Sequence, residues 1–421
     1  MAGFAPGYPS TRSVTLVCRK RDTFMCLAQG RAALALGLLR VCTFAPESTP
    51  SFQLRRDEVE CLARTRNNRP LRCVAVANTQ DRVNAEAAPR PRVLFICGSL
   101  NQTTQLHAVS RALPDVHARF SPFYGAAAVS ALRDLGLIEN TIGGRKLRDR
   151  CVRYLESQSL PIDFDGGRGP YDLVVGCTDV ALPDNLGAAP LVVVQEGILD
   201  PNGVLLHWVQ RFPRLLPRWL AGTAASGLSG KYARFCVASE GYRNLFVSRG
   251  APAERLVVTG IPNFDDCASF RQNDFPHRGY VLVCSSDARE TFKRHDRPAF
   301  IRRCLRIAGR RQLFFKLHPN ENAPRARREL RELAPGASIF SEGPTEAMVA
   351  NCSVLITEWS SVAFVGLALG KEVHSSHSLA ELRELLPEQN RSAAQRIAQV
   401  CEGLLAPFRA RAEPAAPKAA E

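Results

Sequence analysis

The chain has 421 residues, 45% of them hydrophobic and 23% charged, a composition of soluble globular protein that excludes a fibrous or wholly disordered chain. Its length is enough for two domains and a tail. The 55 lysines and arginines against 40 acidic residues give a net charge of +15, which favours anionic partners. No RNA-recognition signature, zinc-binding Cys/His spacing or basic coiled-coil region is present, so we do not expect nucleic acid as a partner.

Fourteen cysteines are scattered along the sequence without any Cys-x-x-Cys pair. Several lie inside apolar runs, as Cys97 and Cys284 do, and buried cysteine behaves as a small hydrophobic residue. This favours reduced core residues in a cytoplasmic protein over a disulfide framework or a metal site. No apolar run reaches the ~20 residues that a membrane-spanning helix needs.

Residues 1–90 differ in character from the rest. They are rich in Arg, Cys, Pro and Asn, show no persistent helical or strand period, and end in a linker-like composition at 84–92. We predict a poorly ordered N-terminal extension here. A transit-like leader is the minor alternative.

From residue 93 onward, short apolar runs alternate with helical patterns. The first series has apolar runs at 93–97, 171–176, 191–195, 233–238 and 255–260, and helical patterns at 106–113 and 124–157. Continuous apolar strands that alternate with helices indicate a parallel sheet covered on both faces. We therefore predict a Rossmann-like domain over 91–262.

A polar, irregular stretch at 263–279 is the expected interdomain linker. A second series follows, with strands at 280–284, 312–316, 338–340 and 353–357 and helices at 297–309, 324–333, 344–351, 361–369 and 378–407. This predicts a second Rossmann-like domain over 280–408 and a frayed tail over 409–421. The expected fold is α/β, with two parallel-sheet domains facing a cleft.

In open α/β sheets, ligands bind at the carboxyl ends of the strands. The loop after strand 353–357 carries Glu358, Ser360 and Ser361 at the start of a helix, where hydroxyls and backbone N–H groups can hold a diphosphate. Glu358 can accept hydrogen bonds from a ribose or from the hydroxyls of the donor. The simpler alternative is that one serine only caps the helix.

The strand at 312–316 ends in Lys316-Leu-His318-Pro. Alternation places Lys316 and His318 on one face of the strand, where both can contact a phosphate. A Lys-x-His pair is usually a surface feature, but its place shortly before the Ser-Ser loop supports a functional interpretation. Ser285, directly after strand 280–284, completes the predicted donor-binding set.

The Lys-Leu-His-Pro motif, followed about forty residues later by Leu-Ile-Thr-Glu-Trp-Ser-Ser, resembles CDP-glycerol glycerophosphotransferases and related capsule-polysaccharide transferases. That family commonly reads Thr-Asp-Tyr-Ser-Ser, so Glu358 and Trp359 depart from its pattern. The resemblance covers mainly residues 280–372. It implies a GT-B fold, a nucleotide-activated donor in the second domain, and a sugar or polyol phosphate passed to an acceptor hydroxyl in surface polysaccharide or glycolipid synthesis.

Two residues of the first domain are candidate catalytic bases. His107 follows the Gly98–Thr104 loop, which resembles the first acceptor-side loop of GT-B transferases. Glu196 lies in Val-Gln-Glu-Gly, where glycerophosphotransferases carry His-Gly, and its carboxylate could take a proton from an acceptor hydroxyl. The structural alternatives are a helix-face histidine and a polar loop residue or cap. We expect no metal and no cofactor, because helix dipoles and basic residues can replace a metal.

Two rival functions stay open. UDP-N-acetylglucosamine 2-epimerases share the fold, but their Gly-Thr-Arg-Pro-Glu opening is absent here. A non-catalytic protein that binds nucleotide sugars is the other rival. The nucleotide base, the transferred group and the acceptor (a glycan, a lipid or a polyol) are not determined by the sequence.

Residues 205–220 mix aromatic and aliphatic side chains with three arginines. Such a stretch could lie at an anionic membrane surface and place a cytoplasmic enzyme at the inner face of the membrane. The favoured alternative is a buried helix of the first domain, interrupted by proline, with arginines at its edge.

Overall fold

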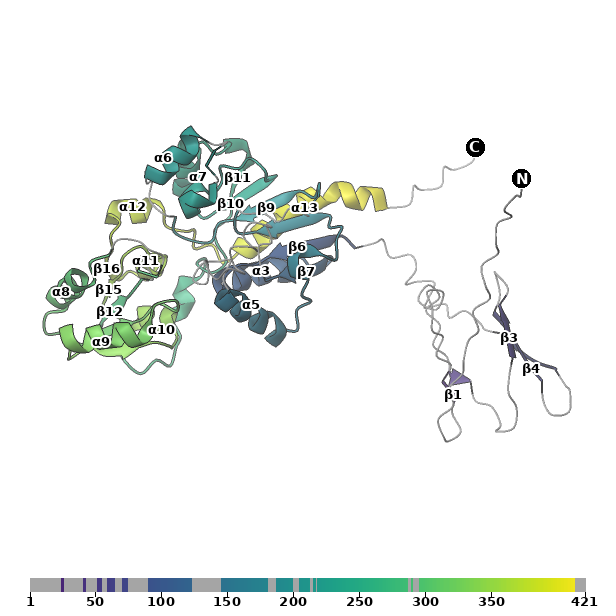
Figure 1. The fold of residues 1–421 in the computed structure, drawn as a ribbon, viewed down its shortest axis with the longest axis horizontal. Coiled ribbons are helices and arrows are strands. Elements are labelled where there is room, and N and C mark those ends of the chain that lie inside the picture. The colour runs from purple at the N-terminus through teal and green to yellow at the C-terminus, as the bar shows by residue number, and fades with distance from the viewer. Residues whose placement is uncertain are drawn as a thin grey trace, which may run out of the picture. The chain divides into compact units, whose positions relative to one another are not determined.

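The computed structural model describes residues 90–122, 145–180, 187–199, 204–212, 215–216, 218–286, 289–290 and 295–412, together with five short strands before residue 75 (Figure 1). The chain divides into two compact units, Met1–Ala88 and Pro89–Glu421. The described strands of the first unit pair antiparallel, as β1 (Phe24–Met25) with β2 (Val41–Cys42), and as β3 (Ser51–Leu54), β4 (Val59–Arg64) and β5 (Pro70–Val74). The rest of the predicted extension, and residues 413–421 of the predicted tail, lie outside the described residues.

The first sheet of the larger unit has six parallel strands in the order β11-β10-β9-β8-β6-β7. They are β6 (Arg92–Ile96), β7 (His117–Ser121), β8 (Leu173–Gly176), β9 (Leu191–Val194), β10 (Arg234–Val237) and β11 (Leu256–Val258). Strands β8 and β9 are buried throughout, because helices cover both faces of the sheet. The strand order reverses between β6 and β8.

The helices of this domain are α3 (Leu100–Arg111), α5 (Arg145–Ser157), α6 (Val204–Arg211) and α7 (Glu240–Ser248), with 3-10 turns η1 (Phe164–Gly166), η2 (Arg218–Ala225) and η3 (Ala253–Arg255). Ser99 and Ser239 cap α3 and α7 by accepting the N–H groups of Gln102 and Tyr242. The predicted helical region 124–157 corresponds to α5, and residues 123–144 lie outside the described residues.

The second sheet has five parallel strands in the order β14-β13-β12-β15-β16. They are β12 (Val281–Cys284), β13 (Leu313–Lys316), β14 (Ser338–Phe340), β15 (Val354–Ile356) and β16 (Glu372–His374). Around them lie η4 (Cys267–Arg271), α8 (Arg297–Ala308), α9 (Ala323–Leu333), α10 (Thr345–Asn351), α11 (Val362–Ala368) and α12 (Leu379–Glu384). The order 3-2-1-4-5, counted along this domain, reverses between β12 and β15. The predicted α/β class with two Rossmann-like, parallel-sheet domains is confirmed.

The last helix corrects the predicted extent of the second domain. The helical pattern at 378–407 is two helices, α12 and α13 (Ala393–Ala412), separated around Pro387. Ile397, Cys401 and Leu405 of α13 are fully buried in one cluster with the first sheet. The chain therefore crosses back to the first domain after α12, and Figure 1 shows α13 in yellow against that sheet.

The described cysteines agree with the expectation of reduced core residues. All nine, from Cys97 to Cys401, are buried and form no disulfide. Burial raises the pKa of the Cys97, Cys177 and Cys236 thiols, which lie in or directly after strands of the first sheet. Within the described part of the chain, no helix is both long and apolar enough to cross a membrane. The same residues contain no group of three or more His, Cys, Asp or Glu side chains arranged to hold a metal ion.

Candidate functional site

Polar side chains from two loops meet at the switch point of the second sheet. The loop after β12 carries Ser286, whose hydroxyl donates to Glu358 Oε2 in the loop after β15, at 3.0 Å. Nε2 of the nearly buried His295 lies 2.9 Å from the same oxygen. Strands β12 and β15 are neighbours, and the chain leads from β12 towards one edge of the sheet and from β15 towards the other. Open α/β sheets bind ligands in the crevice that forms at the carboxyl ends of two such strands. Glu358 therefore lies where a ligand of this domain is expected.

A buried ionic cluster supports the neighbouring strand ends. The Ser285 hydroxyl accepts the backbone N–H of His318 at 3.1 Å and donates to Glu321. Glu321 lies 3.0 Å from Nη2 of Arg297 and 3.6 Å from Nη2 of Arg289, and the side chains of Glu321 and Arg297 are 1% and 2% exposed. The cluster ties the start of α8 to the turn after β13. Ser285 is thus buried and stabilises the turn at His318, and it does not line the ligand-binding surface that the sequence predicted.

Lys316 is also buried, with 6% of its surface exposed. Its ammonium group donates to the carbonyl oxygens of Leu317 and Ser341, at 3.3 and 3.5 Å, and has no carboxylate at salt-bridge distance among the described residues. Burial lowers the pKa of Lys316. His318 is half-buried, and its Nδ1 accepts the N–H of Asn320 at 3.2 Å. Of this predicted pair, His318 is the more accessible to a ligand.

Ser361 joins the two domains. Its hydroxyl accepts the backbone N–H of Ile198, in the loop after β9, at 3.0 Å, and makes no capping hydrogen bond to α11. A Cβ on Gly197 would lie 2.4 Å from that hydroxyl, so a larger residue at this position would displace the Ser361 side chain from its contact. Ser360 accepts the N–H of Val362 at 3.4 Å, a weak cap. The carboxyl ends of both sheets therefore meet at Gly197 and Ser361.

Glu196 lies directly beside this contact. Its carboxylate accepts from the Ser99 hydroxyl at 2.9 Å and from Gln102 Nε2 at 2.6 Å. Both donors are neutral and belong to the N-terminal end of α3, whose dipole favours a negative charge. The carboxylate is thus fixed in orientation, and no described residue forms an ion pair with it. This is the arrangement that a general base needs.

His107 lies away from this edge. It is two turns into α3, where its Nδ1 is 2.9 Å from the Tyr154 hydroxyl on α5 and its ring packs edge-on against Phe120. Burial, and then the charge of Arg111, lower the pKa of His107. The structure places Glu196 beside the Ile198–Ser361 contact, and it places Glu358 and His318 in loops that follow strands β15 and β13. His107 instead contacts α5 and β7.

Several residues that build this site were not predicted from the sequence. Ser99 and Gln102 lie in the Gly98–Thr104 loop, and the small polar residues at the start of α3 were the available signal. Arg297 and Glu321 gave no signal, because 55 basic residues occur throughout the chain and no local spacing marks the one that is buried.

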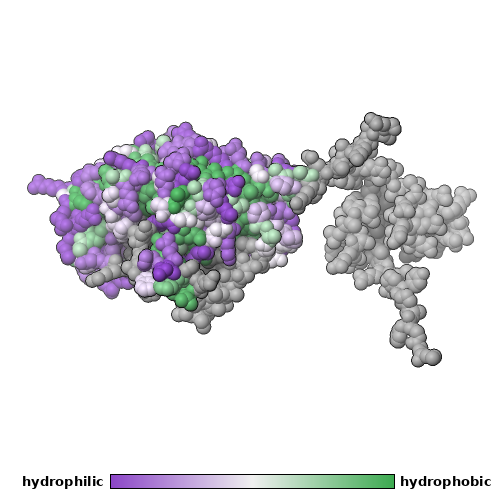
Figure 2. Space-filling view, turned by 90° about the horizontal axis from the view of Figure 1, so that it is seen from above, coloured by the Kyte–Doolittle hydropathy of each residue, from purple (hydrophilic) through white to green (hydrophobic). Residues whose placement is uncertain are grey.

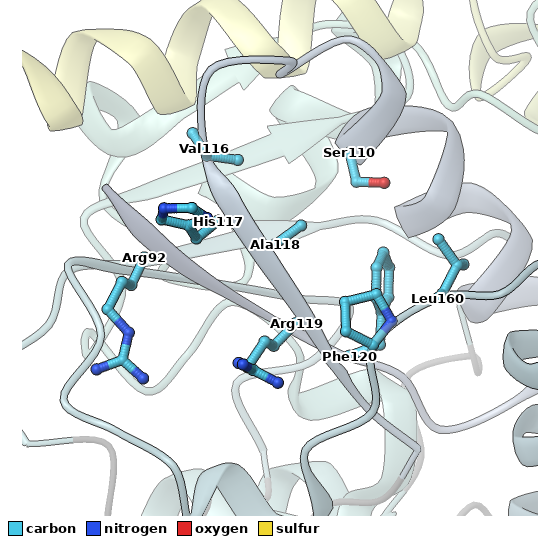
Figure 3. Close-up of a pocket in the computed structure, with 9 residues that line it drawn as sticks. Arg92, Ser110, Val116, His117, Ala118, Arg119, Phe120 and Leu160 are labelled. Atoms are coloured by element: carbon cyan, nitrogen blue, oxygen red, sulfur yellow. The ribbon is translucent and has the colours of Figure 1, made fainter. Parts of the chain in front are cut away.

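A hollow of about 560 Å³ lies elsewhere, around the edge strand β7 (Figure 3). Arg92, His117 and Arg119 line it together with Phe120 and Leu160. It contains none of the predicted site residues, and Arg92 begins β6, at the opposite end of the strand from Ser99. This hollow therefore provides positions for control substitutions outside the predicted site.

No protein-family model matches the sequence, and no curated protein matches it. Solved structures do resemble the chain. A UDP-GlcNAc 2-epimerase from Methanocaldococcus jannaschii, in complex with UDP-GlcNAc and UDP, is 13% identical with a TM-score of 0.47 over 74% of this chain and 99% of that one. The UDP-N-acetylglucosamine 2-epimerase from Rickettsia bellii is 13% identical, with a TM-score of 0.45 over 77% and 98%.

The Anabaena protein HepE in complex with UDP is 14% identical, with a TM-score of 0.44 over 76% of this chain and 92% of that one. These values are too low to transfer an activity or a ligand. None of the three is a CDP-glycerol glycerophosphotransferase, and the resemblance to that family rests on the sequence motifs alone.

Proposed function

We propose that the chain is an enzyme that uses a nucleotide-activated sugar or polyol phosphate and passes the activated group to an acceptor hydroxyl. One observation carries the proposal. Glu196 lies two residues before Ile198, whose N–H donates to Ser361 in the loop after β15 of the second sheet. One domain thus offers a base, and the other offers the end of an open α/β sheet where nucleotides bind.

Donor binding is assigned to the second domain. Glu358, His318, Ser360 and Ser361 are the side chains that a donor would touch, with Glu358 on the ribose or sugar hydroxyls and the others on the phosphates. Ser285 and Lys316 are buried and act by holding the turn after β13. This division follows from exposure, because a side chain that is 3% exposed cannot contact a ligand unless the loop moves.

The chemical step is assigned to Glu196. Its carboxylate takes the proton of the acceptor hydroxyl while the acceptor oxygen forms a bond to the activated carbon or phosphorus of the donor. The bond from that atom to the nucleotide phosphate breaks, and the nucleotide leaves with the electron pair. His318 and the serine hydroxyls stabilise the charge that develops on the phosphate. No metal or cofactor enters this scheme, and the acceptor is a glycan, a lipid or a polyol.

The test begins with a thermal-shift screen of the full chain against UDP-, CDP-, GDP- and CMP-linked compounds. Specific binding raises the melting temperature in proportion to the logarithm of ligand concentration. The donor found in this way is then incubated with candidate acceptors, and the products are separated by mass. Nucleotide release that requires an acceptor supports a transferase.

Other outcomes decide between the rivals. A change in the sugar of the donor without any acceptor would replace the transferase with a 2-epimerase-like isomerase. Binding without turnover would replace both with a nucleotide-sugar-binding protein. No binding of any compound would contradict the assignment of the second domain as a donor site.

A further inference from the structure

The α6 helix and the residues that follow it leave part of their apolar surface exposed. Leu206 and Val209 pack into a small cluster with η2. Trp208 on the helix is 49% exposed, and Phe212 and Leu215, which follow the end of the helix, are 38% and 79% exposed. The indole and phenyl rings stack at 5.5 Å, so they form one continuous surface. We call Trp208, Phe212 and Leu215 the α6 patch.

Core packing explains Leu206 and Val209 but not the α6 patch. Single exposed apolar residues are ordinary, whereas several large ones close together mark a surface that contacts something else. Figure 2 looks onto the side of the molecule that carries α6 in Figure 1 and shows hydrophobic residues among hydrophilic ones there. The surroundings of the patch indicate what it contacts.

The segment of the chain that carries the patch is basic. Residues 204–239 include the five cations Arg211, Arg214, Arg218, Lys231 and Arg234 and no acidic residue. The Arg211 guanidinium lies 5.9 Å from the centre of the Phe212 ring. Arg218 and Arg249 line a hollow of about 180 Å³ beside α6, together with Gln210. Apolar side chains are thus flanked by arginines that can pair with phosphate.

We propose that the α6 patch docks the protein on an anionic phospholipid bilayer. Trp208, Phe212 and Leu215 enter the boundary between headgroups and acyl chains, and Arg211 and Arg218 pair with the lipid phosphates. A tryptophan beside arginines is typical of this boundary, because the ring is apolar and its N–H stays hydrated. The inference does not depend on the proposed function and extends it only by placing the enzyme near lipid acceptors.

The test is co-sedimentation of the full chain with vesicles of pure phosphatidylcholine and of equal parts phosphatidylcholine and phosphatidylglycerol. We expect binding only to the anionic vesicles. Leu215→Ser should lower the partition coefficient by about tenfold, the scale of burying one leucine, and Arg211→Glu by at least about fivefold. Leu305→Ser and Arg302→Glu, at exposed positions of α8, are the matched controls and should bind like the wild type.

Trp208 supplies an independent readout. In a chain with Trp219→Phe and Trp359→Phe, its emission should shift to the blue with anionic vesicles and stay unchanged with phosphatidylcholine alone. Equal binding to both vesicles, or equal losses in patch and control variants, would overturn the proposal. A dimer in lipid-free solution that Leu215→Ser dissociates would also overturn it, because the patch would then be an interface with a second copy.

Discussion

The carboxyl ends of the two sheets are built by different means. At the first sheet, Glu196 is half-buried and held by the neutral donors Ser99 and Gln102. At the second, Glu321 is buried against Arg297 and Arg289, and Arg289 also forms a two-point pair with Glu329 at 2.8 and 2.9 Å. At the first edge no described residue forms an ion pair with Glu196, whereas at the second Glu321 is paired with two arginines inside the protein.

This difference suggests a catalytic role for Glu196 and a structural role for the Glu321 cluster. A carboxylate held by neutral donors can gain a proton without breaking an ion pair, which suits a base. A buried ion pair has lost its hydration and depends on its partner, so it fixes geometry and tolerates no change of charge. We therefore expect substitutions at the first edge to affect turnover, and substitutions in the ionic cluster at the second to affect folding.

The largest expected effect is on turnover. Glu196→Gln keeps the size of the side chain and removes the base, so turnover of donor and acceptor should fall by about a thousandfold, within the range of general-base catalysis. Nucleotide affinity should stay at the wild-type value, because we assign the donor to the second domain. Steady-state kinetics and calorimetric titration measure the two quantities. An equal loss of affinity would mean that Glu196 binds the donor, and the contrast between the two edges would disappear.

The next effect is on stability. Arg297→Leu leaves Glu321 buried without its closest cation and should lower the free energy of unfolding by about 3 kcal/mol, as for other broken buried pairs. The double variant Arg297→Leu with Glu321→Leu should recover part of this loss, because no isolated charge remains. Urea unfolding measures both. A loss in the double variant as large as in the single one would show that shape, and not charge, matters at this position.

The sequence predicted most of the fold because the central strands are continuous apolar runs. Strands such as Leu191–Val194 and Val281–Cys284 are bordered by turn residues, so they can be recognised from the sequence alone. In the larger unit, the missed strands are β7 and β16, each at one edge of its sheet. Their sequences, His-Ala-Arg-Phe-Ser and Glu-Val-His, alternate polar and apolar residues over a few positions, because an edge strand is partly exposed.

The candidate site was predicted only in part, and the reason is that its contacts are distant in the sequence. Glu196, Ser361 and Ser285 could be named because each follows an apolar strand. Their partners could not, since the pair Ile198–Ser361 is separated by 163 positions and Ser99–Glu196 by 97. Likewise, α13 looks like part of the second domain in sequence, and only its packing shows that it covers the first.

A smaller effect concerns the point where the edges meet. Ser361→Ala should weaken nucleotide binding by about 1–2 kcal/mol if its hydroxyl also contacts the donor phosphate. Ser360→Ala and His318→Ala complete the series, and a cap-only role predicts lower melting temperatures with unchanged affinity. If all three folded variants keep wild-type affinity, the donor-site assignment is wrong.

Gly197→Ala sharpens the same test from the other domain. The added methyl group would meet the Ser361 hydroxyl at 2.4 Å and should push the two loops apart. We expect this single change to lower turnover, and Ser361→Ala on the same background to restore part of it by removing the clashing oxygen. If the second change gives no recovery, the Gly197–Ser361 approach does not limit the reaction.

The smallest effect is a pH dependence, and it tests whether His107 belongs to the site at all. Burial, and then Arg111, lower its pKa in the folded state below the ordinary 6.5. Between the two values the unfolded chain binds more protons than the folded one, so stability should rise with pH and be lost as the pH falls below about 6.5. His107→Gln should flatten this slope in melting curves taken from pH 7.5 to pH 5.5, and Arg111→Leu should reduce it, because one cause of the lowered pKa is then removed.

Turnover at pH 7.5 should not change in His107→Gln, since the imidazole faces Tyr154 and Phe120 and not Glu196. A loss of turnover comparable to that of Glu196→Gln would instead make His107 the base and place the chemistry on the side of α3 that faces α5.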